Sequence, residues 1–394
     1  MPAQAVTTEE APASADVVVC GAGVIGLGIA WRLAGQGLDV VVVDPAPGSG
    51  ASWTAAGMLA PVTELHYGEA PLLQLNLASA RRYPEFVGEL EQASDLDVGY
   101  RRCGTVTAAW DGADLADLRA LATFAASLGE SGELLTGREL RSLVPHLAPG
   151  LPGGFYVPDD HQVDNRQLHR ALLTAAARSG AVTVPRAVAE IRRSGEAVAG
   201  VVLDDGTRIS TPRVVLAAGT WSAGLRGLPA DLVPPVRPVK GQTLRLRAAA
   251  DTVPDLVVRA AVRGAPIYVV PRTGGEVVVG ASSEEAGFDV SPRAGAVYEL
   301  LRDAQSVLPG LSEARFVDVS TGLRPGSPDN APLIGATDIA GLTIATGHYR
   351  NGILLTPITA EVVAELVTTG EAPELIRAFA PDRFRAGRRS EVSA

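Results

Sequence analysis

The fold is decided by residues 16–44, DVVVCGAGVIGLGIAWRLAGQGLDVVVVD. The β-branched run Asp16–Cys20 predicts a fully buried strand, and Leu38–Val43 predicts a second one. Between them, the apolar pattern from Val24 to about Ala34 predicts a helix that ends at a pair of glycines. Strand, glycine turn, helix and strand in this order predict a βαβ unit at the front of the chain.

The turn of this unit has the glycine spacing of a dinucleotide-binding loop. Gly21 permits the sharp turn out of the strand, Gly23 lets the backbone approach a pyrophosphate, and Gly26 lets the helix pack closely on the sheet. Asp44 ends the next strand, where a carboxylate can accept hydrogen bonds from ribose hydroxyls. A glycine motif alone is weak evidence, but its position between strand and helix makes it strong. It does not distinguish NAD from FAD.

Further elements follow along the chain without an internal repeat or a long linker. Two sheets in closely packed domains are therefore expected. Helices are predicted over residues 72–90, 115–128, 165–179 and 352–367. Strands are predicted over 198–203 and 208–209 (a hairpin), 213–218, 239–246, 267–270, 276–279 and 343–345.

Composition restricts the class of protein. The net charge of −10 disfavours nucleic acid and anionic membranes as partners. Two cysteines are too few for a disulfide framework, which indicates a reducing compartment. Residues 1–15 carry no basic residue, so they are expected to form a disordered tail and not a signal peptide. No apolar run is long enough to span a membrane. A soluble cytoplasmic protein is expected.

Small residues dominate the segment Gly50–Met58, which follows the second strand. Such residues allow the backbone to run close to a flat ring system, although a loop packed only for compactness is the alternative. Together with Gly219–Ser222 after a later buried strand, this pattern resembles the D-amino acid oxidase family of FAD-dependent flavoproteins.

Two arginines, Arg324 and Arg350, lie in glycine-rich stretches that are predicted to be turns. An arginine fork matches a carboxylate bidentately. Solvated loop arginines are the alternative for either one alone. Tyr268, in a predicted hairpin, can offer its hydroxyl to the same carboxylate or serve only for packing. Asn351 and Gly352 are predicted to open the last helix, with the helix dipole facing a flavin.

The resemblance extends over almost the whole chain after the tail and is densest from Gly322 to Pro357. Within the family, the chain resembles the glycine oxidases that supply thiamine biosynthesis. This implies an α/β fold with a Rossmann-type, glutathione-reductase-like FAD-binding domain and a mixed-sheet α+β substrate domain. The implied FAD-binding domain comprises residues 16–90, 158–236 and 326–380, the substrate domain comprises 91–157 and 237–325, and 381–394 form a C-terminal tail.

The resemblance also assigns residues to ligands. It implies that Arg324 and Arg350 bind the substrate carboxylate with help from Tyr268. The implied FAD contacts are Gly21, Gly23, Val24, Ile25, Gly26, Asp44, Pro45, Ala51, Ser52, Ala56, Gly57, Met58, Val188, Gly219, His348, Tyr349, Arg350, Asn351, Gly352, Ile353 and Leu354. Related sarcosine oxidases attach FAD through a cysteine near the C-terminus. This chain has no cysteine after Cys103, so non-covalent FAD is expected.

The implied reaction is the oxidative deamination of glycine by dioxygen, with an imine product that enters thiazole synthesis or hydrolyses to glyoxylate. No acid–base residue and no metal are expected. Sarcosine or D-amino acid oxidation remains an alternative, as does an amino-acid dehydrogenase with an electron-transfer partner, and a flavoprotein without activity is a third reading. A homo-oligomer is expected.

Overall fold

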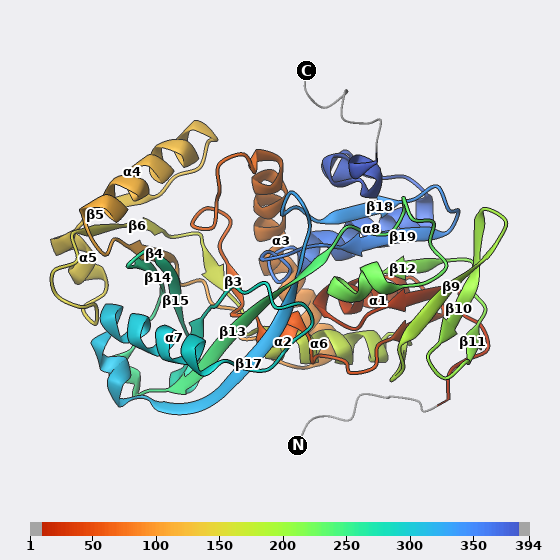
Figure 1. Cartoon of the computed structure of the whole chain (residues 1–394), viewed down its shortest axis with the longest axis horizontal. Coiled ribbons are helices and arrows are strands. Elements are labelled where there is room, and N and C mark those ends of the chain that lie inside the picture. Colours follow the sequence, from red (N-terminus) through yellow and green to blue (C-terminus); the bar gives the residue numbers. More distant parts are fainter. Residues whose placement is uncertain (1–9, 386–394) are drawn as a thin grey trace.

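Two large sheets organise residues 10–385, which are the residues that the computed structural model describes. Figure 1 shows one sheet at each end of the long axis, with strands β13 and β17 crossing the middle of the molecule. The strand orders are β18-β19-β12-β1-β2-β8 in the six-stranded sheet and β17-β13-β16-β15-β14-β4-β6-β5 in the eight-stranded sheet.

The six-stranded sheet has the glycine turn at its centre. Its strands are β1 (Val17–Cys20), β2 (Val40–Val43), β8 (Val182–Val184), β12 (Val214–Leu216), β18 (Leu333–Ala336) and β19 (Leu342–Thr346). All neighbours pair in parallel except β18 with β19. Parallel strands need both faces covered, which is why they read as continuous valine runs.

Helices and a small sheet cover the two faces. One core cluster joins the six-stranded sheet to α1 (Val24–Gly35), α3 (Ala70–Ser94), α6 (Asn165–Arg178) and α8 (Thr356–Thr369). The other joins it to a three-stranded antiparallel sheet of β9 (Val188–Ser194), β10 (Ala197–Leu203) and β11 (Arg208–Ile209). The expected hairpin is therefore present, with β9 as a further strand.

The eight-stranded sheet is mixed. Its strands are β4 (Thr105–Ala108), β5 (Glu133–Thr136), β6 (Gly153–Val157), β13 (Arg237–Arg247), β14 (Val257–Val262), β15 (Ala265–Pro271), β16 (Glu276–Gly280) and β17 (Arg315–Gly326). Only β14 with β4 is a parallel pair among these strands. Helix α7 (Ala294–Val307) packs on this sheet, and α4 (Gly112–Ser127) and α5 (Gly137–Leu143) flank its edge at β5 and β6.

Short elements connect the two sheets. Helix α2 (Ala51–Thr54) contacts both β17 and α6. Strands β3 (Met58–Leu59) and β7 (His161–Gln162) form a two-stranded ladder, and the 3₁₀ turn η1 (Gly219–Gly224) follows β12. The other 3₁₀ turns of the described residues are η2 (Ala250–Thr252), η3 (Thr273–Gly275), η4 (Pro309–Glu313), η5 (Glu374–Phe379) and η6 (Pro381–Phe384).

Two expected elements are wrong. Arg324 does not lie in a glycine-rich turn, because β17 runs through it and pairs Arg324 with Val239 of β13. The last helix begins at Thr356 and not at Gly352. Residues 351–355 form turns instead, and Pro357 occupies the first turn of the helix, where its missing N–H costs nothing.

The described part of each terminus is tied to the fold. The amide of Ala15 donates to the carbonyl of Ser210 at 3.0 Å, so Ala15, within the expected disordered tail, is part of the fold. Near the other end, the guanidinium of Arg383 pairs with Asp329 at 2.9 Å, within the expected C-terminal tail. Expectations for residues 1–9 and 386–394 lie outside the described residues.

Candidate active site

The glycine turn between β1 and α1 is closed by contacts that exclude larger residues. Gly21 has φ of +110°, and a Cβ there would lie 2.5 Å from the carbonyl oxygen of Ala217, just after β12. A Cβ on Gly26 would overlap with the carbonyl of Gly21, so Gly26 brings the helix onto the turn as expected. Gly23 faces the hydroxyl of Ser52, which accepts from the amide of Val24 at 3.1 Å.

Asp44 connects the end of β2 to this turn. One carboxylate oxygen accepts from the amide of Ala22 at 2.8 Å, and the other accepts from the amide of Ala46 at 2.8 Å. The carboxylate also lines the adjoining cavity. Each oxygen has lone pairs beyond these bonds, so the group can accept hydrogen bonds from a ligand.

One continuous cavity of about 720 Å³ runs from the glycine turn to the arginine-bearing strand β17. This size is in the range of small-molecule and cofactor sites. Most of the expected cofactor residues line it. They are Gly21, Gly23, Val24, Ile25, Asp44, Pro45, Ala51, Ser52, Ala56, Gly57, Met58, Val188, Gly219, His348, Tyr349, Arg350, Gly352 and Ile353.

Three expected cofactor residues do not line the cavity. Gly26 lies behind the turn, in the packing position described above. Leu354 is buried in the core, where its carbonyl accepts from the hydroxyl of Ser79 at 2.6 Å. Asn351 is also buried, and its backbone is engaged in the turn that precedes α8. The resemblance had assigned both residues to the flavin.

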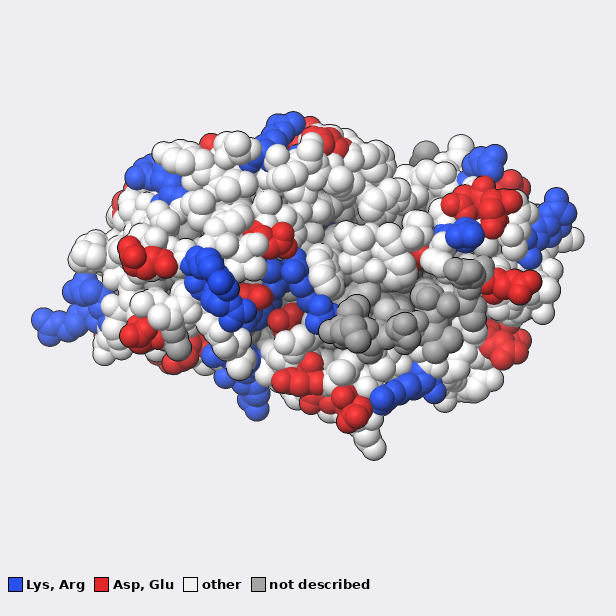
Figure 2. Space-filling model, turned by 90° about the horizontal axis from the view of Figure 1, so that it is seen from below, with Lys and Arg blue, Asp and Glu red and all other residues white. Residues whose placement is uncertain are grey.

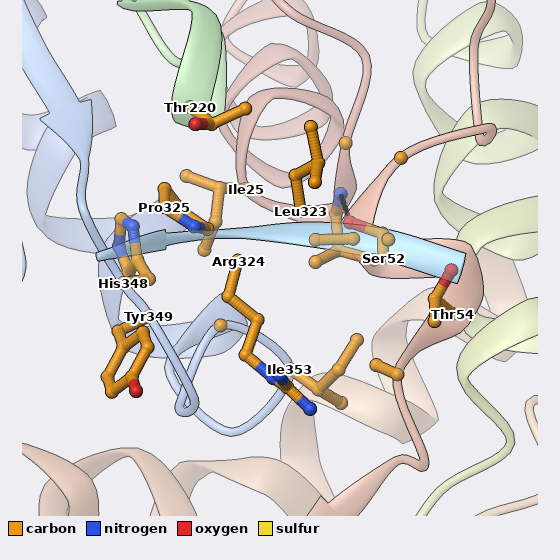
Figure 3. Close-up of a pocket in the computed structure, with 18 of the residues that line it drawn as sticks. Ile25, Ser52, Thr54, Thr220, Leu323, Arg324, Pro325, His348, Tyr349 and Ile353 are labelled. Carbon is orange, nitrogen blue, oxygen red and sulfur yellow. Dashed lines mark hydrogen bonds between the residues drawn. The ribbon is translucent and has the colours of Figure 1, made fainter. Parts of the chain in front are cut away.

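Arg324 enters the cavity from β17. Figure 3 shows its side chain among Tyr349 and Ile353. Its Nη1 donates to the carbonyl of Ser282 at 3.1 Å. Within residues 10–385, no carboxylate lies within the 4.0 Å of an ion pair with Arg324. The cavity therefore contains a guanidinium charge that the described protein does not neutralise.

Arg350 also lines the cavity but already has partners. Its Nη2 lies 3.5 Å from a carboxylate oxygen of Glu69, and its Nη1 lies 2.7 Å from Nε2 of His66. Burial and the charge of Arg350 lower the pKa of His66, so the ring is neutral at pH 7 and accepts from the arginine. Tyr349, with φ of +47°, places its ring 5.3 Å from the guanidinium carbon. Arg324 is therefore more available than Arg350 to bind an anionic ligand.

Tyr268 of β15 lines the cavity near Arg324. Burial raises the pKa of its phenol to about 12, although the positive charge of Arg324 opposes this effect. The hydroxyl is protonated at neutral pH and can donate a hydrogen bond. Its oxygen lies so close to Gly280 that a Cβ at that position would overlap with it.

A second charged pair in the cavity was not predicted from the sequence. Arg259 of β14 donates to Glu64 at 2.5 Å, and both residues line the cavity. Burial raises the pKa of Glu64, but Arg259 outweighs it, so the net pKa is lowered and the carboxylate is ionised. Arg259 pairs in register with Tyr268, a relationship that the strand pattern would have revealed if β14 had been predicted. Nothing in the sequence singles out Glu64.

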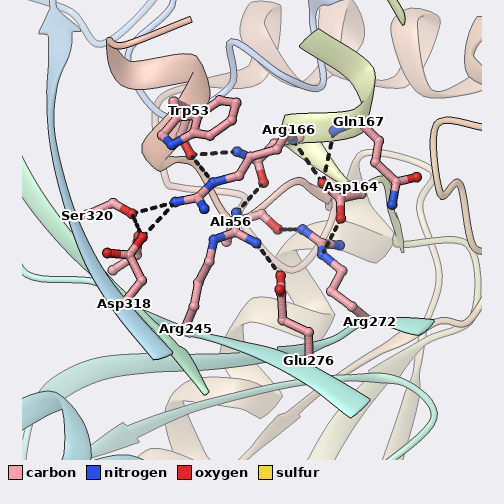
Figure 4. A network of polar contacts seen from close by, with 12 residues as sticks. Trp53, Ala56, Asp164, Arg166, Gln167, Arg245, Arg272, Glu276, Asp318 and Ser320 are labelled. Carbon is pink, nitrogen blue, oxygen red and sulfur yellow. Dashed lines mark hydrogen bonds and ion pairs between the residues drawn. The ribbon is translucent and has the colours of Figure 1, made fainter. Parts of the chain in front are cut away.

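A cluster of buried arginines lies under the segment 52–57 (Figure 4). Arg272 donates to the carbonyl of Ala56 at 2.5 Å. Arg245 donates to the side chain of Asn165 at 3.1 Å, and Asn165 donates in turn to the carbonyl of Trp53 at 2.9 Å. Arg245 lies in β13 of the eight-stranded sheet, Arg272 directly follows β15 of the same sheet, and Asn165 opens α6. The cluster therefore holds this cavity wall between both halves of the molecule.

The cavity fits a dinucleotide. The start of α1 at the glycine turn suits a pyrophosphate, and Asp44 suits a ribose. The hydroxyl of Thr220, which lines the cavity, is buried and has no hydrogen-bond partner among the described residues. A bound ligand can supply that partner. Fold and site therefore define a dinucleotide-binding protein whose cavity also contains the cation of Arg324, which has no carboxylate partner among the described residues.

The chain belongs to the FAD dependent oxidoreductase family, whose model matches residues 16–366. It is 36% identical over 361 residues to a glycine oxidase of Geobacillus kaustophilus, covering 90% of this chain and 93% of that protein. The crystal structure of glycine oxidase from Geobacillus kaustophilus superposes with a TM-score of 0.89 at 34% identity, covering 95% of this chain and 100% of the other. The expected fold class, family and FAD cofactor are confirmed.

Other relatives are longer. The chain is 37% identical over 381 residues to a "Bifunctional protein ThiO/ThiG" of Synechocystis sp.. The match covers 94% of this chain but 54% of that relative. The chain thus spans about half the length of several curated relatives that it matches.

Within residues 10–385, no helix combines the length and apolarity needed to cross a membrane. Figure 2 shows basic side chains beside acidic ones on the face seen there, and not a continuous basic surface. Nucleic-acid binding proteins concentrate their basic residues on one face.

Proposed function

We propose that this protein uses non-covalently bound FAD to oxidise glycine. The observation that carries the proposal is Arg324, a guanidinium that has no carboxylate partner among residues 10–385 and lies in the cavity that begins at the dinucleotide turn. A small amino acid supplies the missing carboxylate. The glycine oxidase named above, which matches this chain over most of both lengths, supports the same substrate.

The residues of the chain bind and orient the substrate. Arg324 holds the carboxylate through a charge-assisted hydrogen bond, and the protonated hydroxyl of Tyr268 donates a second one. Arg350 contributes positive charge from the opposite segment of the wall. These contacts fix the direction of the Cα–H bond, and orientation of this kind lowers a barrier without an acid or base from the protein. FAD, when bound, supplies the two-electron oxidation.

The overall reaction converts glycine, dioxygen and water to glyoxylate, ammonia and hydrogen peroxide. His348 is not a proton acceptor in it. Its ring is buried, its Nε2 lies 3.1 Å from the hydroxyl of Thr359, and burial lowers its pKa to about 3. Among the described residues of the cavity, the bases Glu64 and His66 are already paired with Arg259 and Arg350. This is consistent with loss of the ammonium proton to solvent before oxidation.

Sarcosine and small D-amino acids remain alternatives, as does a dehydrogenase with another electron acceptor. Anaerobic mixing of the yellow protein with glycine, sarcosine, D-alanine and D-proline ranks the substrates by the rate of flavin bleaching. Glycine is expected to bleach the flavin fastest, and admission of air is expected to restore the colour with release of peroxide. Flavin that no amino acid bleaches would contradict the proposal.

Non-covalent attachment is tested separately. Cys20 lies at the end of β1, and burial raises the pKa of its thiol to about 12, so it is unreactive. Acid precipitation is expected to release all yellow colour into the supernatant as FAD. Colour that stays with the pellet would show covalent attachment.

The wider assignments are part of the same proposal. The two sheets support an FAD-binding domain of residues 16–90, 158–236 and 326–380 and a substrate domain of 91–157 and 237–325. The ThiO/ThiG relatives support delivery of the imine product to thiazole synthesis in thiamine biosynthesis. We further propose that the protein is cytoplasmic and forms a homo-oligomer. Sedimentation of the purified protein tests the oligomeric state.

A further inference from the structure

Lys240 is the single lysine of the chain, and its side chain is fully buried. It lies in β13, the strand that pairs with β17. Its ammonium group donates to a carboxylate oxygen of Asp289 at 3.2 Å and to the carbonyl of Ser291 at 2.5 Å. A buried ammonium is costly unless it is paired, so these two contacts hold their partners in place.

Both partners belong to residues 281–293, the loop that joins β16 to α7. Hydrogen bonds from Ser291, and then from Lys240, lower the pKa of Asp289 to about 2, so the pair is ionised at neutral pH. The backbone of Lys240 also exchanges two hydrogen bonds of 2.9 Å with that of Glu284. The next inward-facing residue of β13, Gln242, donates to the carboxylate of Glu284 at 2.7 Å and accepts from the amide of Arg293 at 2.9 Å.

The start of the same loop forms a wall of the cavity, at Ser282 and Ser283. The carbonyl of Ser282 is the acceptor for Arg324 described above. Farther along, Phe288 lies with its ring 6.4 Å from that of Trp221, which lines the cavity from η1. The loop therefore contacts both Arg324 of β17 and Trp221 of η1, which follows β12 of the six-stranded sheet.

We propose that Lys240 is a positioning residue, which fastens the 281–293 loop so that Ser282 holds Arg324 in the orientation that binds the substrate carboxylate. The proposal rests on the function proposed above. Lys240 does not line the cavity, so it acts through the loop and not on the substrate. Removing the ammonium group of Lys240, or the carboxylate of Asp289, is expected to free the same part of the cavity wall, the 281–293 loop.

Two variants test this inference in the FAD-loaded protein. Lys240→Met keeps the length of the side chain and removes its charge, whereas Asp289→Ala changes an exposed loop residue and leaves β13 intact. Both are expected to weaken binding of acetate, measured by the change in flavin absorbance, and to raise KM for glycine by about tenfold to a hundredfold, the loss typical of a group displaced by about 1 Å. The double variant is expected to be no worse than either single variant.

FAD affinity and the rate at which oxygen reoxidises the reduced flavin are expected to stay unchanged in both variants. Asp205→Ala is the matched control. Asp205 pairs with Arg186 at 3.2 Å and also accepts from an amide two residues ahead, as Asp289 does, but it lies in the β10–β11 turn. Acetate binding by this variant should equal that of the parent.

The outcomes separate this inference from the proposed function. If Arg324→Ala binds acetate as the parent does, the carboxylate-anchor function itself is wrong. If Arg324→Ala loses acetate binding while Asp289→Ala retains it at full strength, the function stands and the role of Lys240 is overturned. Should Lys240→Met fail to fold, Asp289→Ala alone decides.

Discussion

Gly241 lies directly beneath the guanidinium group of Arg324, and a Cβ at position 241 would overlap with both terminal nitrogens of that group. The guanidinium group therefore packs directly on the backbone of β13, where Gly241 has no side chain. Gly241→Ala is expected to push Arg324 off this surface, raising KM for glycine while the flavin spectrum persists. Gly295→Ala is the control, because its Cβ would meet nothing within 4 Å. An unchanged KM in Gly241→Ala would show that Arg324 tolerates the shift.

Direct removal of the anchor gives a larger effect. Arg324→Ala is expected to lower kcat/KM by roughly a hundredfold or more, equivalent to about 3 kcal/mol of lost anchoring. Arg324→Lys should recover only part of this, since an ammonium keeps the charge but not the fork. Glycine ethyl ester, which lacks the anionic carboxylate, should be a poor substrate of the parent. Equal kcat/KM for ester and glycine would remove the carboxylate anchor from the mechanism.

Asp44→Ala is expected to weaken FAD binding. The substitution removes an acceptor for the ribose and also releases the amide of Ala22 in the glycine turn. Hydrogen bonds to a charged group contribute roughly 1.5–3 kcal/mol, or about tenfold to over a hundredfold in affinity. Fluorescence titration of the apoprotein with FAD measures the change. The same FAD affinity in variant and parent would place Asp44 outside the cofactor site.

Arg272→Met is expected to destabilise the fold and the flavin site together. The carbonyl of Ala56 and the side chain of Gln162 lose their donor, at about 1–3 kcal/mol for each buried acceptor left unpaired. The temperature of thermal unfolding and the affinity for FAD are both expected to fall. Arg247→Met in β13 is the control, because Arg247 is exposed and its side chain hydrogen-bonds only with the carbonyl of Gly274 among the described residues. Loss of stability with intact FAD affinity would restrict the cluster to a folding role.

His348 predicts a pH dependence of stability. Burial lowers the pKa of its imidazole to about 3, below the unfolded value near 6.5. The unfolded chain therefore binds the proton first as pH falls, so this contribution is complete above about pH 6.5 and is lost progressively towards pH 3. Relative to His348→Gln, the parent is expected to lose about 2 kcal/mol of unfolding free energy between pH 7 and pH 5. Parallel pH curves for the two proteins would show that His348 titrates normally.

Much of the fold was predictable because its signals are local. The valine runs of β1 and β2 and the spacing of Gly21, Gly23 and Gly26 specify the central βαβ unit by burial and backbone freedom alone. The cavity residues of the turn followed from the same pattern. Helix α6 was also predicted to within one residue, because its apolar stripe and the glycine after it are both present in the sequence.

The misses depend on contacts between distant segments. β17 was predicted as a turn at Arg324 because its glycines are explained only by their partners. Gly322, for example, lies against Thr54 of α2, and a Cβ there would overlap with that side chain. The pair of Arg259 and Glu64 likewise joins residues 195 positions apart. The position of Lys240 beneath the 281–293 loop has the same origin.

The order of strands in the six-stranded sheet determines when each strand can pair with its neighbour as the chain is synthesised. β1 is made first, but its neighbour β12 begins at Val214, and β12 in turn pairs with β19 at Leu342–Thr346. The glycine turn therefore leaves the ribosome some three hundred residues before the wall at residues 347–353 that completes its cavity. Capture of the flavin therefore has to follow the synthesis of β19. Until β19 is made, β12 is unpaired on one edge of the growing sheet.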